Sequence, residues 1–399
     1  MRRFSIGPGL LLCILCFRSL YASFSGSVRP TLSIMDYAAS DSASRYIVKS
    51  PVRLMLRLGS GSFRGELALA VTPSMGNPSL SGEDFSGGAY RFRINDIERR
   101  LVPADWSEDT RLSVLQNLDR ASVRIRLPAL TVTAGRQAVF WGVAKSISPT
   151  DFIAPFGYSE TDTEYRSGVD ALRINIPAGM LSEVDLGYLF GEDAALSRSG
   201  FWARGRFYVL RTDLSVLAGG FRQNLLLGGS INRTLGRGTG WLEAAFTRTG
   251  ALSDSSSAGE SFWSVSAGWD RSWFSSLLYA YLEYHFSSAG ANGVPGYSSV
   301  LQSPALNGGG IYLLGKQYIC PGISWNPHPL VTAKTGALIS LTDGSAFISV
   351  SGEYSAGDNS LLEAGIYRGL GEGPDENGLP GSEFGSWPGE VFLRYGYYF

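Results

Sequence analysis

Short segments in which apolar and polar residues alternate recur along most of this chain. The clearest of them span residues 183–190, 262–270 and 346–355. Because successive side chains of a β-strand point to opposite faces, each segment predicts a strand with one apolar and one polar face. The polar faces are rich in Ser, Gly and single charges. In the first segment the apolar face carries Val184, Leu186, Tyr188 and Phe190, and the polar face carries Glu183, Asp185 and Gly187.

The composition of the polar face separates two kinds of β-protein. A soluble β-sandwich also alternates, but its inward face is apolar and continuous. Here the polar faces suit a wet lumen, and each segment has the roughly ten residues that a tilted strand needs to cross a bilayer. A sheet in lipid has to close, because lipid offers no hydrogen-bond partner to an open edge. The pattern therefore predicts an all-β fold, a transmembrane antiparallel up-and-down β-barrel.

Connection lengths set the orientation and the number of the strands. Outer-membrane barrels have short periplasmic turns and longer extracellular loops. Counting back from the C-terminus gives about 18 strands, within a range of about 16 to 20. This count treats residues 90–97 as an element outside the wall, within one long excursion. The predicted extracellular loops span residues 74–118, 142–165, 191–200, 249–261, 287–308 and 369–388.

The N-terminus predicts export. Arg2 and Arg3 precede an apolar run over residues 10–17, and small residues follow near Ala22. This pattern is typical of a secretory signal peptide, and the run is too short for a stable membrane span. We therefore expect a cleaved signal peptide over residues 1–22 and a single outer-membrane barrel domain over residues 23–399. Cys320 would remain as a lone cysteine, which excludes an intrachain disulfide.

The last nine residues form one further alternating segment. Val391, Leu393, Tyr395, Tyr397 and Phe399 share one face of an extended strand. The segment resembles the final strand of bacterial outer-membrane β-barrels, whose terminal Phe is read by the barrel-insertion machinery. The resemblance implies an assembly signal at Tyr395, Tyr397 and Phe399. It also implies a location in the bacterial outer membrane, with the insertion machinery, periplasmic chaperones and outer-membrane lipids including lipopolysaccharide as partners.

Composition narrows the partners further. The formal net charge is -1, which gives no electrostatic case for nucleic-acid binding. After the N-terminal segment the sequence has no long uninterrupted apolar run, so it predicts no membrane-spanning helix. A homo-oligomer stays open, because a subunit contact face and a lipid face look alike in sequence.

The strongest internal constellation lies between residues 117 and 156. It contains Gly135-Arg136-Gln137, then Trp141-Gly142, then Pro149 and Asp151. This order resembles a group of porin-like bacterial outer-membrane proteins that carry a Gly-Arg-Gln strand, a Trp-Gly pair and a Pro-x-Asp loop. The resemblance covers about forty residues plus the terminal strand. It implies an outer-membrane channel or barrel, and no particular solute.

Arg136 and Gln137 lead directly into the predicted loop 142–165. Asp151 lies in that loop and Asp170 follows it. One hypothesis is that an ion pair between Arg136 and one of these aspartates holds the loop in the lumen as a constriction. The alternative is an arginine at the rim that is solvated or paired locally.

Charges at inward positions are unevenly distributed along the chain. Arginines prevail in the first half and acids in the second half, so opposite sides of the pore would carry opposite charge. Such a transverse field would weaken simple ion selectivity; the alternative is scattered charge that merely keeps the pore wet. The predicted lumen arginines are Arg53, Arg57, Arg64, Arg124, Arg126, Arg173, Arg204 and Arg206, and the acids are Glu243, Asp270, Glu283, Glu353 and Glu363.

Inward aromatic residues raise a further possibility. Flat rings could stack on sugar faces, although such tyrosines more often pack within the lumen. The tyrosines predicted to face inward are Tyr279, Tyr281, Tyr312, Tyr318 and Tyr367.

Signals of catalysis are weak. The chain has two histidines, His285 and His328, far apart in sequence. It has no Gly-x-Ser-x-Gly elbow and no His-Glu-x-x-His zinc site, so we predict no enzyme, catalytic residue, metal or cofactor. The sequence instead predicts a porin-like channel for passive diffusion of small polar solutes, with a lumen narrowed by in-folded loops. The main alternative is a non-transporting or plugged barrel in polysaccharide or lipid export, envelope assembly or surface adhesion.

Overall fold

The computed structural model describes residues 21–36, 45–77, 92–97, 99–103, 111–158, 160, 162–253 and 259–399. Residues 1–20 of the predicted signal peptide lie outside the described residues, as do Tyr90 and Arg91 of the predicted non-wall element. Within the described residues no helix is long and apolar enough to cross a membrane.

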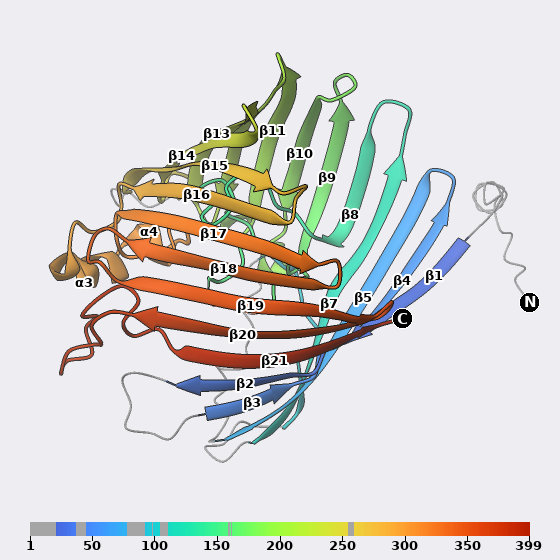
Figure 1. Ribbon diagram of the computed structural model, residues 1–399. Coiled ribbons are helices and arrows are strands. Elements are labelled where there is room, and N and C mark those ends of the chain that lie inside the picture. Colours follow the sequence, from blue (N-terminus) through green and yellow to red (C-terminus); the bar gives the residue numbers. More distant parts are fainter. Residues whose placement is uncertain are drawn as a thin grey trace, which may run out of the picture.

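The chain forms one closed antiparallel sheet (Figure 1). In chain order its strands are β1 (Tyr21–Val28), β2 (Thr31–Asp36), β3 (Arg45–Lys49), β4 (Val52–Ser60), β5 (Phe63–Asn77), β6 (Arg100–Val102), β7 (Leu112–Arg126), β8 (Thr131–Gln137), β9 (Val169–Pro177), β10 (Glu183–Leu189), β11 (Gly200–Val209), β12 (Thr212–Phe221), β13 (Asn224–Leu235), β14 (Gly238–Arg248), β15 (Ser261–Trp273), β16 (Leu278–Ser287), β17 (Gln317–His328), β18 (Val331–Ser340), β19 (Ala346–Gly357), β20 (Ser360–Leu370) and β21 (Gly389–Tyr398).

The wall is an 18-stranded barrel, as the sequence predicts. β1 and β2 form one wall strand and β3 and β4 form the next, because Pro30 and Pro51 interrupt the ladder where they cannot donate a backbone hydrogen bond. β6 pairs with β7 only and adds no wall strand. The barrel closes where β21 pairs with β1 and β2.

The predicted alternation of lipid-facing and lumen-facing residues is confirmed along the wall. In β21, Val391 is 50% exposed and Leu393 is 49% exposed, whereas Phe392 is 2% exposed and Arg394 is 6% exposed. Phe392 and Arg394 pair in register with Ser33 and Thr31 of β2, which are also buried. The apolar face is thus turned to lipid and the mixed face to the barrel interior.

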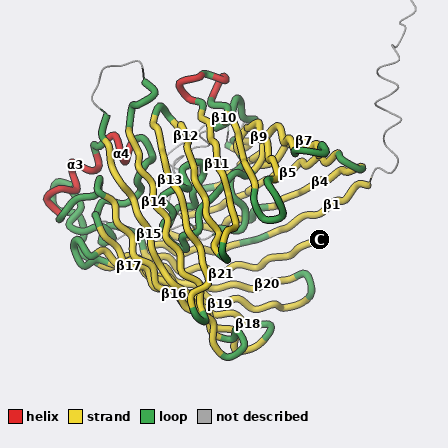
Figure 2. Tube along the Cα trace, turned by 90° about the horizontal axis from the view of Figure 1, so that it is seen from above, coloured by secondary structure: helices red, strands yellow, loops and turns green. Residues whose placement is uncertain are grey.

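The connections follow the predicted rhythm, with shifted bounds. Because β5 continues to Asn77 and β7 begins at Leu112, the first excursion spans 78–111. The loop after β8 spans 138–168, and the loop after β16 spans 288–316 and carries η3 (Val294–Gly296), α3 (Tyr297–Leu301) and α4 (Pro304–Asn307). Two further short helices, η1 (Glu192–Ala194) and η2 (Leu196–Arg198), precede β11. These helical segments lie at the rim that carries the long loops (Figure 2).

β17 continues through a proline-containing segment to His328, which still pairs with Val331. The register shifts between Trp325 and His328, so the strand absorbs Pro327 and Pro329 lies in the turn that follows.

Candidate functional site

The loop 138–168 folds into the barrel and packs against its inner wall. Trp141 lies 5.3 Å from Trp202 of β11, and Phe152 stacks at 4.6 Å on Phe221 of β12, measured between ring centroids. Phe92, from the segment 92–97, belongs to the same buried cluster. Aromatic packing of this kind excludes water from one sector of the lumen.

Glu243, at the middle of β14, is the first anchor of this loop. Its side chain is 0% exposed. One carboxylate oxygen accepts hydrogen bonds from the backbone N–H groups of Val143 at 2.7 Å and Ala144 at 3.0 Å. The other accepts from the Ser148 hydroxyl at 2.6 Å and from the backbone N–H and hydroxyl of Thr150 at 2.9 and 2.7 Å. These hydrogen bonds stabilise the buried negative charge of Glu243, and they also satisfy backbone N–H groups of the loop.

Glu283, on β16, is the second anchor and is also 0% exposed. It accepts from the backbone N–H groups of Lys145 at 2.7 Å, Ser146 at 3.1 Å and Ile147 at 2.9 Å. The Trp241 indole N–H donates to the same carboxylate at 2.9 Å. The two glutamates together bind nearly every backbone donor between residues 143 and 150, and so fix this end of the loop.

The distal end of the loop is tied to the closure seam of the barrel. Arg29, between β1 and β2, binds Asp162 at 2.7 Å and Glu164 at 2.6 Å. Tyr398 of β21 donates to Glu164 at 2.9 Å. The loop therefore crosses the lumen from β14 and β16 to the seam, held by carboxylates at both ends.

Arg136 holds the base of the loop. Its guanidinium binds both oxygens of Asp170, at 2.7 and 3.0 Å, and Asp96 at 2.7 Å. It also donates to the carbonyl oxygens of Leu118 and Asn95, so that all five N–H donors are used. The neighbouring Gln137 donates to the Ala171 carbonyl at 3.1 Å. Arg136 thus joins β8 to β9 and to the segment 92–97.

The sequence hypothesis offered two aspartates as partners of Arg136, and the structure pairs it with Asp170 rather than with Asp151. Asp96 was missed, because nothing in the sequence shows that the segment 92–97 returns to the barrel interior. Burial acts to raise the pKa of Asp96, but hydrogen bonds from Arg93 and Arg136 outweigh it and hold that pKa below its ordinary value.

Asp151 pairs with Arg166 at the other end of the same loop. The Arg166 guanidinium also lies over the rings of Phe140 and Phe156, at 4.8 and 4.7 Å from the centroids. Burial raises the pKa of Asp151 from 3.8 to about 6, and Arg166 only partly opposes this rise.

The raised pKa of Asp151 predicts a pH-dependent loop. A carboxyl group whose pKa is higher in the docked loop stabilises docking when protonated, so this contribution is full below about pH 4 and is lost as the pH rises through about 6. Amide hydrogen exchange, corrected for its intrinsic pH dependence, should show weaker protection of residues 143–150 at about pH 7.5 than at about pH 5. Asp151→Asn should remove most of this difference; an unchanged difference in the variant would assign it to another group.

The wall charges differ from the predicted transverse field. Glu243 and Glu283 are buried and bind the loop. Asp270 accepts a hydrogen bond from the Tyr279 hydroxyl at 3.0 Å. Glu353 forms an ion pair with Lys334, and Glu363 forms one with Arg394. On the opposite side Arg173 and Arg204 also have acidic partners, Asp185 and Glu183. The acidic half therefore contributes less to the lumen than the sequence predicts.

A group of arginines near the short-turn end stays exposed to the lumen. Arg64 of β5 and Arg124 of β7 face each other in register. Neither forms an ion pair within the described part of the chain, although Arg124 donates to Thr133 at 3.3 Å. Like charges at directly opposed positions destabilise a sheet unless water or an anion screens them. The other exposed arginines on inward positions here are Arg57, Arg126 and Arg206.

The register places Tyr395, Tyr397 and Phe399 on the lipid face, with Phe24 6.3 Å from Phe399 across the seam. Their role as an assembly signal stays a prediction. No cluster of three or more His, Cys, Asp or Glu side chains that could hold a metal ion occurs among the described residues.

Several anchoring residues could not be assigned from the sequence. Glu243 and Glu283 were predicted as lumen charges but not as loop anchors, and Arg29, Asp162, Glu164 and Arg166 were missed. A usable signal was present at the glutamates: each sits alone at an inward position in the middle of a wall strand, where an isolated charge needs a partner from elsewhere in the fold.

Solved structures with the same fold are outer-membrane channels of the OprD/Occ family. OccK2 (OpdF) of Pseudomonas aeruginosa, solved in complex with glucuronate, is 13% identical, with a TM-score of 0.55 over 94% of this chain and 97% of that chain. OpdK of the same organism, solved with vanillate, is 10% identical, with a TM-score of 0.57 over 95% and 98% of the two chains. A variant of OccD1 (OprD) is 9% identical, with a TM-score of 0.53 over 95% of both chains.

At sequence identities this low, these comparisons show a shared fold and no more. No protein-family model and no curated protein matches the sequence. The resemblance of the chain to porin-like outer-membrane barrels is thus confirmed as a resemblance of fold.

Proposed function

We propose that this protein is an outer-membrane channel for passive diffusion of small polar solutes, with a path narrowed by loop 138–168. The observation that carries the proposal is the tethering of this loop across the lumen by Glu243, Glu283 and Arg29. A loop that merely lay in the lumen would not need buried carboxylates on separate parts of the wall. The tethers fix its position, and a fixed constriction is what selects solutes by size and charge.

The exposed arginines favour anionic solutes. Arg57, Arg64, Arg124 and Arg126 line the lumen at the short-turn end, and among the described residues only Arg57 of this group has an acidic partner, Glu66 at 3.5 Å. At about 0.1 M salt the Debye length is about 10 Å, so wall charges act on ions well inside a barrel lumen. Glucuronate and vanillate, bound in two structures of the same fold, are both carboxylates.

Reversal potentials in a salt gradient test this selectivity. We expect wild type to prefer anions, and the double variant Arg64→Gln/Arg124→Gln to shift the permeability ratio towards unity, more so at low salt. Arg237→Gln, in the exposed turn between β13 and β14, is the matched control and should keep the wild-type ratio. A cation-preferring wild type would contradict the anion preference.

The second candidate function is a plugged barrel that does not transport. It is supported by the buried aromatic cluster around Trp141, Phe152 and Phe221, which fills one sector of the lumen. A folded, heat-modifiable barrel that gives no conductance in a planar bilayer would favour this alternative, with a role in export, envelope assembly or surface adhesion.

A further inference from the structure

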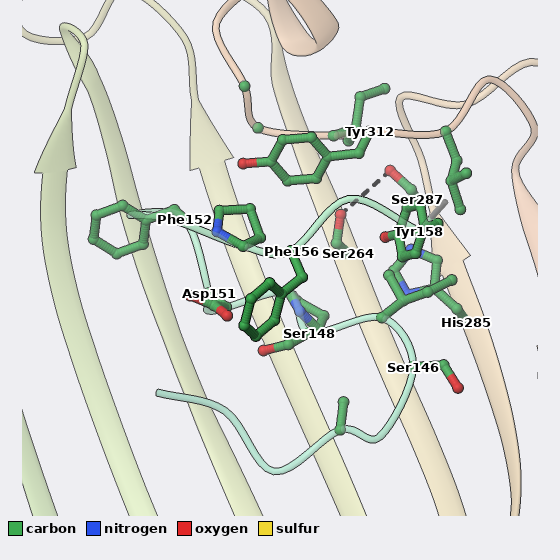
Figure 3. A pocket seen from close by; sticks show the side chains of 18 of the residues that line it. Ser146, Ser148, Asp151, Phe152, Phe156, Tyr158, Ser264, His285, Ser287 and Tyr312 are labelled. Carbon is green, nitrogen blue, oxygen red and sulfur yellow. Dashed lines mark hydrogen bonds between the residues drawn. The ribbon is translucent and has the colours of Figure 1, made fainter. Parts of the chain in front are cut away.

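A cavity of about 410 Å³ lies between the in-folded loop, the inner wall at β15–β17 and the loop 288–316. Figure 3 shows its walls, with Phe152, Phe156 and Tyr158 from the in-folded loop facing residues of the wall and Tyr312. Pockets that hold small ligands fall between about 300 and 1,000 Å³. The volume therefore suits one small ring compound.

Three polar side chains that line this cavity have hydrogen-bonding capacity that the described residues do not use. Asp151 is 5% exposed, and its Oδ1 has no hydrogen-bond partner, although Oδ2 binds Arg166. The Tyr158 hydroxyl has no hydrogen-bond partner among the described residues. The His285 ring uses Nδ1 towards Ser266 at 2.8 Å and leaves Nε2 without a partner in the same part of the chain.

An orphaned oxygen on a nearly buried carboxylate indicates a missing donor, because leaving such an atom unpaired costs free energy. Figure 3 places Asp151 beside the half-buried ring of Phe156, which lies in the loop. Both residues line the cavity, so a ligand there would lie beside the carboxylate and the ring.

The charges around the cavity determine which kind of hydrogen-bond donor a ligand can present to Asp151. Arg166 and Lys145 line it together with Asp151. Since Arg166 already neutralises Asp151, an ammonium group would meet two cations for one anion. Hydroxyl groups donate to a carboxylate without adding charge, and they accept from a tyrosine hydroxyl. The aromatic lining provides flat faces for the C–H groups of a ring.

We infer that this cavity binds a hydroxylated ring of monosaccharide size, with Asp151, Tyr158 and His285 as its polar contacts. The inference deepens the proposed channel function, because it names a class of solute that would dwell beside the constricting loop.

Saturation-transfer NMR on the folded protein in detergent, with D-glucose as probe, tests the site without requiring conductance. We expect Asp151→Asn to weaken binding about tenfold, since a hydrogen bond to a charged acceptor is lost, and Tyr158→Phe to weaken it about fivefold. The matched control is Tyr354→Phe, a tyrosine on the outer face of β19 that does not line this cavity, and this variant should bind glucose as wild type does.

Other results would overturn the inference. Equal glucose binding by wild type and Asp151→Asn, or absence of binding by folded wild type, removes the site. Binding of D-glucosamine clearly tighter than that of glucose would assign Asp151 to an ammonium group instead. A conducting barrel that fails to bind glucose refutes this site alone, whereas a silent barrel that binds glucose refutes the channel and leaves the site standing.

Discussion

Replacing Glu243 and Glu283 together by glutamine is expected to release loop 138–168 from the wall and to increase the single-channel conductance. A glutamine presents an amide N–H₂ where the carboxylate now accepts loop donors, so each site loses charge and several of its hydrogen bonds. Breaking buried charge-assisted contacts of this kind costs on the order of 3–5 kcal/mol per site. Conductance in planar bilayers and amide exchange of residues 143–150 should both rise.

Glu353→Gln is the matched control for this double variant. Glu353 is a lumen carboxylate of β19 that pairs with Lys334 at 2.5 Å, and it forms no hydrogen bond or ion pair with the described residues of the loop. Its conductance and loop protection should stay near those of wild type. If the double variant matched wild type in both measurements while remaining folded, the glutamates would not be the anchors that hold the constriction.

Replacing Arg136 by alanine is expected to lower the free energy of unfolding by about 3–5 kcal/mol. The substitution leaves Asp170 without its cation, removes one of the two arginines that bind Asp96, and takes a donor away from two carbonyl oxygens, in a site where Arg136 is 5% exposed. Urea titration of the protein in lipid vesicles, read by heat-modifiable mobility, measures the loss.

Arg136→Lys separates charge from geometry. Lysine keeps one positive charge but cannot span Asp170 and Asp96 with a planar fork, so it should restore only part of the lost stability. Arg124→Ala, an exposed lumen arginine, should stay within about 0.5 kcal/mol of wild type. Wild-type stability in Arg136→Ala would show that the network is solvated rather than structural.

The barrel could be predicted because the pattern that specifies each strand lies within the sequence of that strand. The alternation in residues 183–190 and 346–355 depends on each strand alone, and it predicted the side of the wall on which Asp185 and Glu353 lie. Turns follow from short breaks in the same pattern. Their bounds shifted by a few residues where the ladder continued past the alternating stretch, as at Asn77.

The arrangement inside the lumen could not be predicted in the same way. The contacts of Glu243 with Val143 and of Arg29 with Asp162 join residues that lie about 100 and 130 positions apart in the sequence. The sequence around each of these residues does not identify its partner. The pairing of Arg136 with Asp170 could be proposed from the sequence, because β8 and β9 are neighbouring strands joined by the loop itself. The two ends of the loop therefore meet in the sheet.

Single-channel recording of the folded protein in a planar bilayer tests the central claim most directly, with the Glu243→Gln/Glu283→Gln variant recorded alongside. The account predicts steady, discrete steps for wild type and larger steps for the variant. A folded wild type that never conducts, joined by a folded variant that is equally silent, would contradict it and leave a barrel that does not serve as a channel.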